Sequence, residues 1–328
     1  MDRRPMPPPL HVPKPGLGRQ MPPAAFTPVL GLFGLGLAWR AVSDAYGVGS
    51  GVADLILGAV TLLFLAAAAL WLSKPLRRRS VIWDELRVLP GQEGVAAASL
   101  SVMLLAASLA PFATRIAGGL AILAFVLHLG LLGLWLLHLR DAPDEARRVT
   151  PVFHLYLVGF ILGGNAANAL GAHDLARALV WAMLLPAGVV WGLSLRQLRG
   201  YRVPAPLRPM LAIHVVPACM FASVAHGAGL TTAAHAFLAL AVVIVVPLII
   251  FARWLTEAGF TPFWGAFTFP IAALATALIT VSGGQGVMGL MGGLVLVAGT
   301  LVIPAIAYRV LKDWPGGRLA ARTHAAEA

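Results

Sequence analysis

The chain has 328 residues, of which 59% are hydrophobic and only 11% are charged. Soluble domains carry about 25% charged residues, so this composition excludes an ordinary soluble protein and indicates a polytopic membrane protein. The formal net charge is +11, but the basic residues gather between apolar stretches, which points to membrane topology and not to a nucleic-acid partner. The single cysteine, Cys219, excludes an intramolecular disulfide.

The Pro-rich, basic residues 1–22 contain no apolar h-region and no small-residue cleavage site, so they do not resemble a signal peptide. We expect a disordered cytoplasmic tail there. Residues 313–328 are predicted to form a cytoplasmic C-terminal tail. Its small and polar part, residues 316–328, is also expected to be disordered.

Between the tails, residues 23–312 hold ten apolar stretches long enough to cross the hydrocarbon core, which takes about 20 residues as a helix. In chain order, the predicted spans are residues 24–45, 52–73, 93–113, 117–139, 150–171, 174–195, 209–228, 231–252, 262–282 and 287–311. The fifth and sixth are the least distinct, because the short loop between them contains His173 and Asp174. The predicted fold class is all-α, with ten transmembrane helices.

The basic residues predict the orientation of these helices. Of the 24 Lys and Arg residues, only Arg40, Arg115 and Arg177 fall outside the N-terminal tail, the loops that lead from an even to an odd helix, and the end of the chain from Arg309 onward. Cytoplasmic loops carry an excess of Lys and Arg. Both termini are therefore predicted to be cytoplasmic, which requires an even number of spans.

The ten helices group into five antiparallel hairpins, because the connections within each pair, such as residues 112–118 and 227–231, are short. The odd helices carry polar residues and prolines, whereas even ones such as residues 238–250 are smoothly apolar. We predict that the odd helices line a central pore and the even helices lie outside it, against lipid. The alternative is an exporter built from two inverted five-helix halves, residues 1–172 and 173–328, which the two-helix period disfavours.

The ninth span contains the sequence Phe267-Thr268-Phe269-Pro270. Proline has no N–H, and its ring crowds the carbonyl four residues back, here that of Ala266, so the helix is expected to bend. At about 100° per residue, Phe267 and Phe269 point roughly 160° apart. Only one of them is expected to face a lumen, and the geometry alone does not choose between them.

No Asp or Glu lies near the middle of a predicted span. Asp44, Asp54, Glu93 and Asp174 all fall at span ends, close to headgroups or water. Buried carboxylates are the usual relays of proton-coupled carriers, so their absence favours passive conduction or a carrier that relays protons through histidine. It also disfavours a cation pathway, whereas an anion pathway needs only donors, dipoles and nearby positive charge.

Three other polar residues are candidates for the pathway. His154 and His214, on the fifth and seventh spans, are predicted to line the pore, with a hydrogen bond between helices as the alternative role. Arg40, at the outer end of the first span, either attracts anions into the outer mouth or extends to the membrane interface beside Trp39.

Metal and cofactor chemistry is not indicated. His128 and His138, ten residues apart on the fourth span, lie about 15 Å apart along the helix axis, too far to bind one ion. The sequence contains no Walker-type Gly-Lys-Ser/Thr motif, no paired Asp-rich motif and no His-Glu-x-x-His motif. We therefore expect no metal, no cofactor and no enzymatic activity.

Several sequence elements together resemble the tellurite-resistance/dicarboxylate transporter family, whose members include TehA-like proteins and the related slow-type anion channels of plants. In order, these elements are Pro22 to Phe26 with Leu30 to Arg40, Trp83 to Leu86, Leu155 to Leu157, His214 to Pro217, and Phe263 to Pro270. They resemble parts of the family's first helix, the acidic element before its third, and its fifth, seventh and ninth helices. The resemblance covers roughly residues 22–312.

The resemblance implies a homotrimer in which each protomer has its own pore, with a phenylalanine of the ninth helix, here Phe269, as the gate. The residues then expected to line the pore are Phe26, Thr27, Ser99, His154, Tyr156, His214, Pro217, Phe267, Thr268 and Pro270. Ser99 and Val158 stand where relatives carry prolines in the third and fifth helices, so the resemblance does not predict kinks there.

The sequence thus predicts passive conduction of small anions across a bacterial inner membrane. The alternative is a proton-linked carrier or exporter of dicarboxylates or oxyanions such as malate, sulfite or tellurite, with pH coupling through His154 or His214. A third class, a structural or sensory membrane protein without transport, predicts no anion flux. Which anion moves is not encoded in a recognisable motif, because an apolar pore selects largely by size and dehydration.

Overall fold

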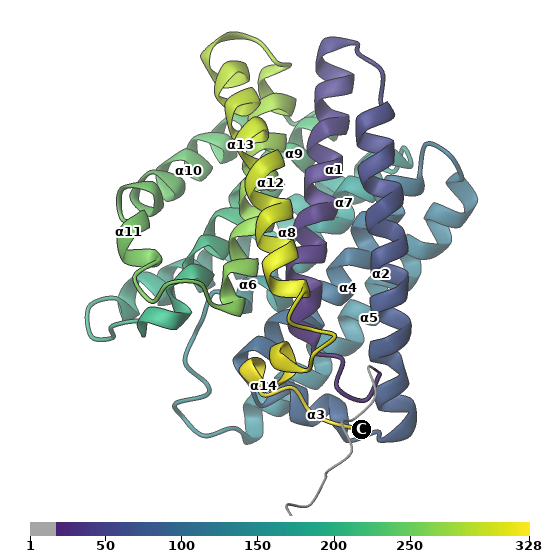
Figure 1. The fold of residues 1–328 in the computed structure, drawn as a ribbon. Helices are drawn as coiled ribbons and strands as arrows, with labels where there is room; N and C mark the ends of the chain where they lie inside the picture. Colours follow the sequence, from purple (N-terminus) through teal and green to yellow (C-terminus); the bar gives the residue numbers. More distant parts are fainter. Residues whose placement is uncertain (1–17) are drawn as a thin grey trace, which may run out of the picture.

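The computed structural model describes residues 18–328 and is built from α-helices joined by turns and 3-10 segments. The predicted tail at residues 1–22 lies mostly outside the described residues. In chain order the helices are α1 (Phe26–Tyr46), α2 (Gly51–Arg77), α3 (Val81–Leu86), α4 (Leu89–Leu109), α5 (Thr114–Asp141), α6 (Val152–Leu157), α7 (Gly163–Ala169), α8 (His173–Gln197), α9 (Val215–Gly227), α10 (Thr231–Ile250), α11 (Ala252–Leu255), α12 (Gly265–Ser282), α13 (Gly286–Leu311) and α14 (Arg318–Thr323) (Figure 1).

Nine helical segments within residues 18–328 are long and apolar enough to cross a membrane. They correspond to all the predicted spans except the fifth, and most of their ends fall within a few residues of the predicted ones. The fifth predicted span, residues 150–171, is present as three short pieces: α6, a 3-10 segment at Gly159–Leu162, and α7. The prediction of an all-α polytopic membrane protein is confirmed.

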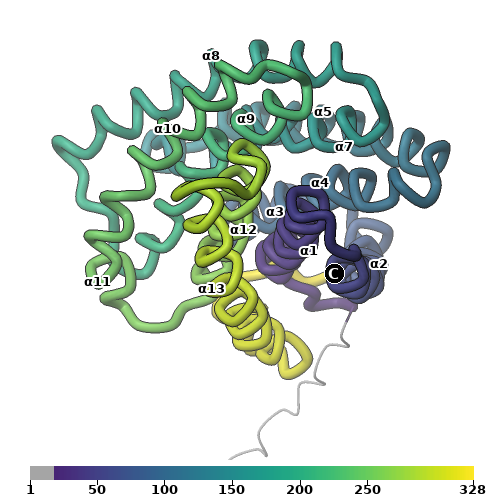
Figure 2. The backbone as a smooth tube through the Cα atoms, turned by 90° about the horizontal axis from the view of Figure 1, so that it is seen from above, coloured from purple at the N-terminus to yellow at the C-terminus, as the bar shows by residue number. Residues whose placement is uncertain are grey.

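The inner and outer positions of the helices differ sharply in burial. In the most apolar stretch of the segments containing α1, α4, α9 and α12, 61–83% of residues are buried inside the protein, compared with 22–33% in α2, α5, α8, α10 and α13. Figure 2 shows the first group near the middle and the second group further out. A helix that is apolar on all sides is suited to lipid on its outer face, as the exposed Leu55, Leu185 and Leu301 illustrate.

Each inner element packs against the outer helix that follows it in the chain: α1 on α2, α4 on α5, α7 on α8, α9 on α10, and α12 on α13. The inner helices α1 and α12 also pack closely on each other. Their approach depends on Gly31, because a Cβ atom there would lie 2.1 Å from Oγ1 of Thr268. Small residues at such contacts are typical of helix packing in membranes.

The fifth span breaks at Val158 although no proline stands there. The break follows from close contacts: a Cβ atom at Gly159 would lie 2.7 Å from a methyl carbon of Leu100 and 2.8 Å from Nε2 of His128. At Gly163 a Cβ atom would meet the Phe125 ring at 2.4 Å. The third span, by contrast, runs through Ser99 as the unbroken helix α4.

The seventh span is also irregular, because its first ten residues, Ala205–His214, form a 3-10 segment before α9 begins. Pro217 is the third residue of α9, where the backbone N–H that proline lacks would have no intrahelical partner. The ninth span starts with a 3-10 turn at Pro262–Trp264 and continues as α12 through Pro270. The fifth and seventh spans therefore change helix type near the middle of the bundle.

The C-terminal segment differs from the expected disorder at residues 316–328. Arg318–Thr323 forms helix α14, with Leu319 and Thr323 buried. The side chain of Asp313 accepts hydrogen bonds from Arg318 and Arg322, each at 3.0 Å. Four-residue spacing places the two arginines on one face of the helix. The short α14 segment is therefore held in place by these contacts with Asp313.

α14 lies near α3 at one end of the bundle (Figure 1). We call this end the basic end, because the Lys- and Arg-rich loops lie there.

Candidate functional site

A small cavity lies where the irregular inner segments meet. Its walls come from α4, from the broken fifth span, from α9 and from α12, and its lining residues are Leu100, His154, Leu155, Val158, Gly159, Ile161, Leu162, Val216, Pro217 and Phe269. The cavity volume is about 10 Å³, and a single water molecule needs at least about 10–15 Å³. The cavity is therefore barely large enough for one water molecule, and its walls are mainly apolar.

Phe269 closes the cavity from the α12 side and is 5% exposed. Its ring lies against the first helix, because a Cβ atom at Gly34 would stand 2.9 Å from ring carbon Cδ2. The ring therefore fills the space between α1 and the cavity. Gly34 was not recognised from the sequence as part of this site; it stands about one helical turn after Gly31, on the same side of α1.

The structure brings His154 and His214 together beside the cavity. Nε2 of His154 lies 3.0 Å from Nδ1 of His214, and the rings meet edge to face. The Trp191 side chain of α8 packs on His154 and donates its indole N–H to the His214 carbonyl at 3.0 Å. Nδ1 of His154 has no hydrogen-bond partner among the described residues. The predicted contact between helices is therefore present, and His154, but not His214, also lines the cavity.

Other predicted residues of the ninth span lie beside the cavity without lining it. Thr268 donates its hydroxyl to the Gly265 carbonyl at 2.6 Å and approaches the Thr27 carbonyl at 3.4 Å, which places it in the α1–α12 contact. Phe267 is half-buried and meets the Trp264 ring edge to face at 5.7 Å. Phe269 is therefore the aromatic residue of this motif that reaches the cavity.

Two further predicted pore residues face outer helices instead. The ring of Phe26 meets Phe64 and Trp71 of α2 at 6.0 and 6.1 Å. Ser99 lies 2.9 Å from Nδ1 of His128 on α5. Both belong to inner helices, but each points toward the hairpin partner of its own helix.

Tyr156 likewise lies outside the cavity. Its ring stacks on Trp135 of α5 at 4.6 Å, and its hydroxyl donates to the Gln92 carbonyl at 2.9 Å. The side chain is fully buried between α4 and α5. The structure thus gives Phe26, Ser99 and Tyr156 packing roles, because a side chain's direction depends on the rotation of its helix.

Arg40 is engaged at the opposite end of the bundle from α14. Its guanidinium donates to Asp54 at 2.8 Å and to the Ser108 carbonyl at 3.0 Å, and it lies 5.8 Å from the centre of the Phe112 ring. These contacts join α1, α2 and α4. Because Asp54 compensates its charge, the field that Arg40 offers an approaching anion is reduced.

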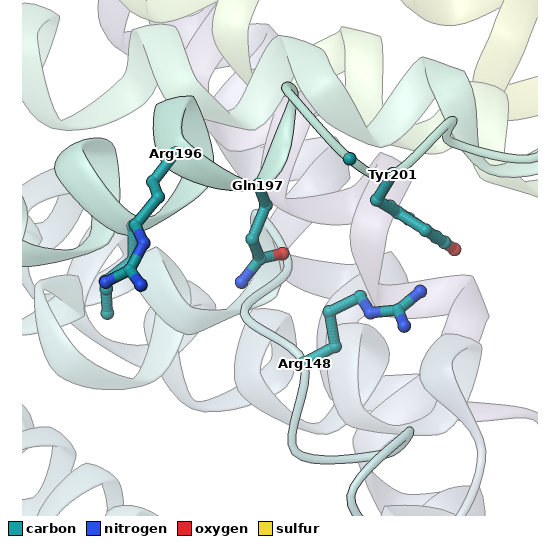
Figure 3. A pocket seen from close by; sticks show the side chains of 6 residues that line it. Arg148, Arg196, Gln197 and Tyr201 are labelled. Atoms are coloured by element: carbon teal, nitrogen blue, oxygen red, sulfur yellow. The ribbon is translucent and has the colours of Figure 1, made fainter.

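A larger surface cavity of about 390 Å³ lies at the basic end and shares no lining residue with the central one. It is lined by Arg148, Leu193, Arg196, Gln197, Gly200 and Tyr201 (Figure 3). The guanidinium of Arg148 lies 3.9 Å from the centre of the Tyr201 ring. Among residues 18–328, no group of three or more His, Cys, Asp or Glu side chains is placed to hold a metal ion.

A family model described as voltage-dependent anion channel (SLAC1) matches residues 20–311 of this chain. The chain belongs to the SLAC1 family. The match covers every membrane-spanning segment and ends at the last residue of α13. Among curated proteins, the comparison found no match to this chain.

Family membership settles the broad class of the protein. It is a multi-pass membrane protein of an anion-transport family, its substrates are small anions, and the family is one of transporters and not of enzymes. The resemblance to the tellurite-resistance/dicarboxylate transporters, which include slow-type anion channels, is confirmed at the level of the family.

Proposed function

We propose that this protein conducts small anions passively along the axis of its inner helices and that Phe269 is the gate. The observation that carries the proposal is the position of the Phe269 ring, which lies between Gly34 of α1 and a cavity lined by α4, the fifth span and α9. One side chain therefore stands where all five inner segments converge. His154 and Pro217 are the other two predicted pore residues on the cavity wall.

The proposed gating follows from size and hydration. A passage with about 10 Å³ of free volume does not admit a hydrated anion, and an apolar constriction excludes ions by dewetting. Movement of the Phe269 ring away from the axis would widen the passage without breaking a hydrogen bond. Opening then requires only that the ring finds another rotamer or that α1 and α12 separate slightly.

Replacing Phe269 by alanine tests the gate. We expect Phe269→Ala to raise anion flux into proteoliposomes at least about tenfold over wild type, which corresponds to a barrier lower by about 1.4 kcal/mol. Phe267→Ala is the matched control. It removes an identical ring two residues away, and the Phe267 side chain does not line the cavity. Equal flux through wild type and Phe269→Ala, or equal gains in both variants, contradicts a gate at Phe269.

Oligomeric state and location belong to the same proposal. The family resemblance supports a homotrimer with one pore in each protomer, and the clustering of Lys and Arg at one end supports both termini on the cytoplasmic side of a bacterial inner membrane. The mass of the purified protein in detergent measures the first. Protease protection of the termini in oriented vesicles measures the second.

A second candidate function is a proton-linked carrier of dicarboxylates or oxyanions such as malate, sulfite or tellurite. The observation that favours it is the contact between His154 and His214 at the cavity wall, because histidine is the side chain that changes charge near neutral pH. Saturable flux whose pH dependence disappears in His154→Gln would favour the carrier. Linear current that reverses at the anion equilibrium potential would favour the channel.

A further inference from the structure

We propose that Glu93 is a proton-binding site on the anion pathway and that anions pass rapidly only when its carboxyl group is protonated. The inference rests on the proposed function, because it assumes that anions move along the axis of the inner helices. The sequence places Glu93 at the end of the third span, close to headgroups or water. In the structure its side chain is only 3% exposed, within the first two turns of α4.

The neighbours of Glu93 along α4 fix its direction. Gln92 points to α5, because its amide oxygen accepts from the indole of Trp135 at 3.3 Å. Gly94 faces the segment before α1, where its added Cβ would stand 2.1 Å from the carbonyl carbon of Pro23. Successive helical side chains are about 100° apart, so Glu93 points into the sector between α5 and α1, toward the bundle interior.

The same helix face leads to the central cavity. Leu100 lies seven residues after Glu93, so the two side chains point within about 20° of each other and are about 10 Å apart along the helix axis. Leu100 is part of the cavity wall. Since α4 starts at the basic end, Glu93 lies on the pathway face of α4 between that end and the cavity that Phe269 closes.

The carboxyl group has no charged partner in this position. Its Oε1 atom is buried without a hydrogen-bond partner among the described residues. Lys74 of α2, the buried cation next to this end of α4, pairs instead with Glu85 of α3 and donates to the Met21 carbonyl. A buried carboxylate without a cation or donor is costly, and the neutral form is favoured.

Two histidines on elements packed against α4 are held by other partners. His128 of α5 contacts Ser99 and the Tyr156 carbonyl, and His154 of α6 contacts His214. The other titratable groups on these elements are Arg40, Asp44, Tyr46, Asp54, Arg77, Asp84, Arg115, His138, Arg140, Asp141 and Tyr156. None of them forms a hydrogen bond or ion pair with Glu93 among the described residues.

Protonation of Glu93 changes what a passing anion meets. An ionised carboxylate on the pathway repels anions, and a unit charge about 10 Å away changes anion occupancy by about tenfold at an intermediate effective dielectric. The neutral carboxyl group removes this repulsion and offers an O–H donor. The proton comes from water at the basic end, so we expect anion flux to rise as the pH on that side falls.

The experiment compares anion flux through wild type and Glu93→Gln in proteoliposomes between about pH 5 and about pH 9, a range that covers the titration of buried carboxyl groups. We expect wild-type flux to fall about tenfold toward high pH, whereas Glu93→Gln stays at the level of the low-pH wild type. Glu93→Asp is expected to keep the pH dependence. Glu145→Gln, an exposed carboxyl in a loop, is the control and is expected to behave like wild type.

A gain of flux at high pH in Glu93→Gln is a result that misfolding cannot produce. The infrared band of a protonated carboxyl group, present in wild type and absent from Glu93→Gln, would support the proton site independently of transport. A pH profile of Glu93→Gln identical to wild type, or loss of its flux at every pH, overturns the inference alone. Absence of anion flux from wild type and from Phe269→Ala at all pH values overturns the proposed function and the inference with it.

Discussion

The fifth and ninth spans differ in helix continuity, and the difference is the reverse of what their prolines would predict. The ninth contains Pro270 within one continuous helix, α12. The fifth has no proline between residues 152 and 169, yet it is divided into α6, a 3-10 segment and α7. The presence of proline therefore does not decide which inner helix of this protein is broken.

The difference lies in what each segment packs against. Gly159 and Gly163 bring the fifth span so close to Leu100, His128 and Phe125 that no side chain fits between them. A regular helix would not follow these contacts, and the chain gives up part of its hydrogen-bond ladder to make them. Pro270 removes only the partner of one carbonyl, and membrane helices tolerate this loss when neighbours compensate.

Substitution of Gly159 tests the packing side of this contrast and has the larger expected effect. We expect Gly159→Ala to destabilise the protein by about 1–3 kcal/mol, the usual cost of overpacking a core. Leu100 can yield, but the His128 ring is held by Ser99 at 2.9 Å and by the Tyr156 carbonyl at 3.2 Å. The thermal unfolding midpoint in detergent measures the change.

Gly130→Ala is the matched control for that experiment. Gly130 lies in the outer helix α5, and a Cβ atom there meets nothing within 4 Å. Alanine is a better helix former than glycine by about 1 kcal/mol, so Gly130→Ala is expected to leave stability unchanged or to raise it. A Gly159→Ala protein as stable as Gly130→Ala would mean that close packing does not hold the break in the fifth span.

Substitution of Pro270 tests the role of proline in this contrast, and its expected effect on stability is smaller. Pro270→Ala restores an N–H that can reach the Ala266 carbonyl, but it removes part of a buried side chain. Because α12 is already continuous through this position, we expect the stability to change by less than about 1 kcal/mol, near the net value of one hydrogen bond. The same unfolding measurement applies, and a loss larger than that of Gly159→Ala would reverse the contrast.

Most of the membrane topology could be predicted from sequence because it depends on composition over about 20 residues. The α2 and α13 helices, for example, lie within a few residues of the predicted 52–73 and 287–311. The C-terminal helix α14 was missed, because it is held by the Asp313 contacts and not by helix propensity. The break in the fifth span was missed for the same kind of reason.

The candidate site was predicted in part. His154, Pro217 and Phe269 lie on the cavity wall, whereas Phe26, Ser99 and Tyr156 pack against outer helices. All six lie on inner segments, and the sequence does not show in which direction each side chain points. Direction depends on the rotation of a helix about its axis, which contacts with its neighbours determine.

Glu93 illustrates the same limit at the basic end. Its position at the end of the predicted span suggested exposure to headgroups or water. The amino-acid sequence gives no sign that α3 and the segment before α1 cover that end of α4. Once Gln92 and Gly94 are seen to face α5 and Pro23, the direction of Glu93 follows. Its burial is thus a property of the assembled bundle.

From the amino-acid sequence alone it follows that this chain crosses a membrane as a bundle of helices, which helices are apolar enough to face lipid, and which family the chain belongs to. These properties follow from local composition and from short motifs. Only the folded structure shows where the inner helices break, that His154 and His214 meet, and that Phe269 and not Phe267 reaches the cavity. Those outcomes depend on close contacts between distant segments, such as Gly34 with Phe269, which no local pattern encodes.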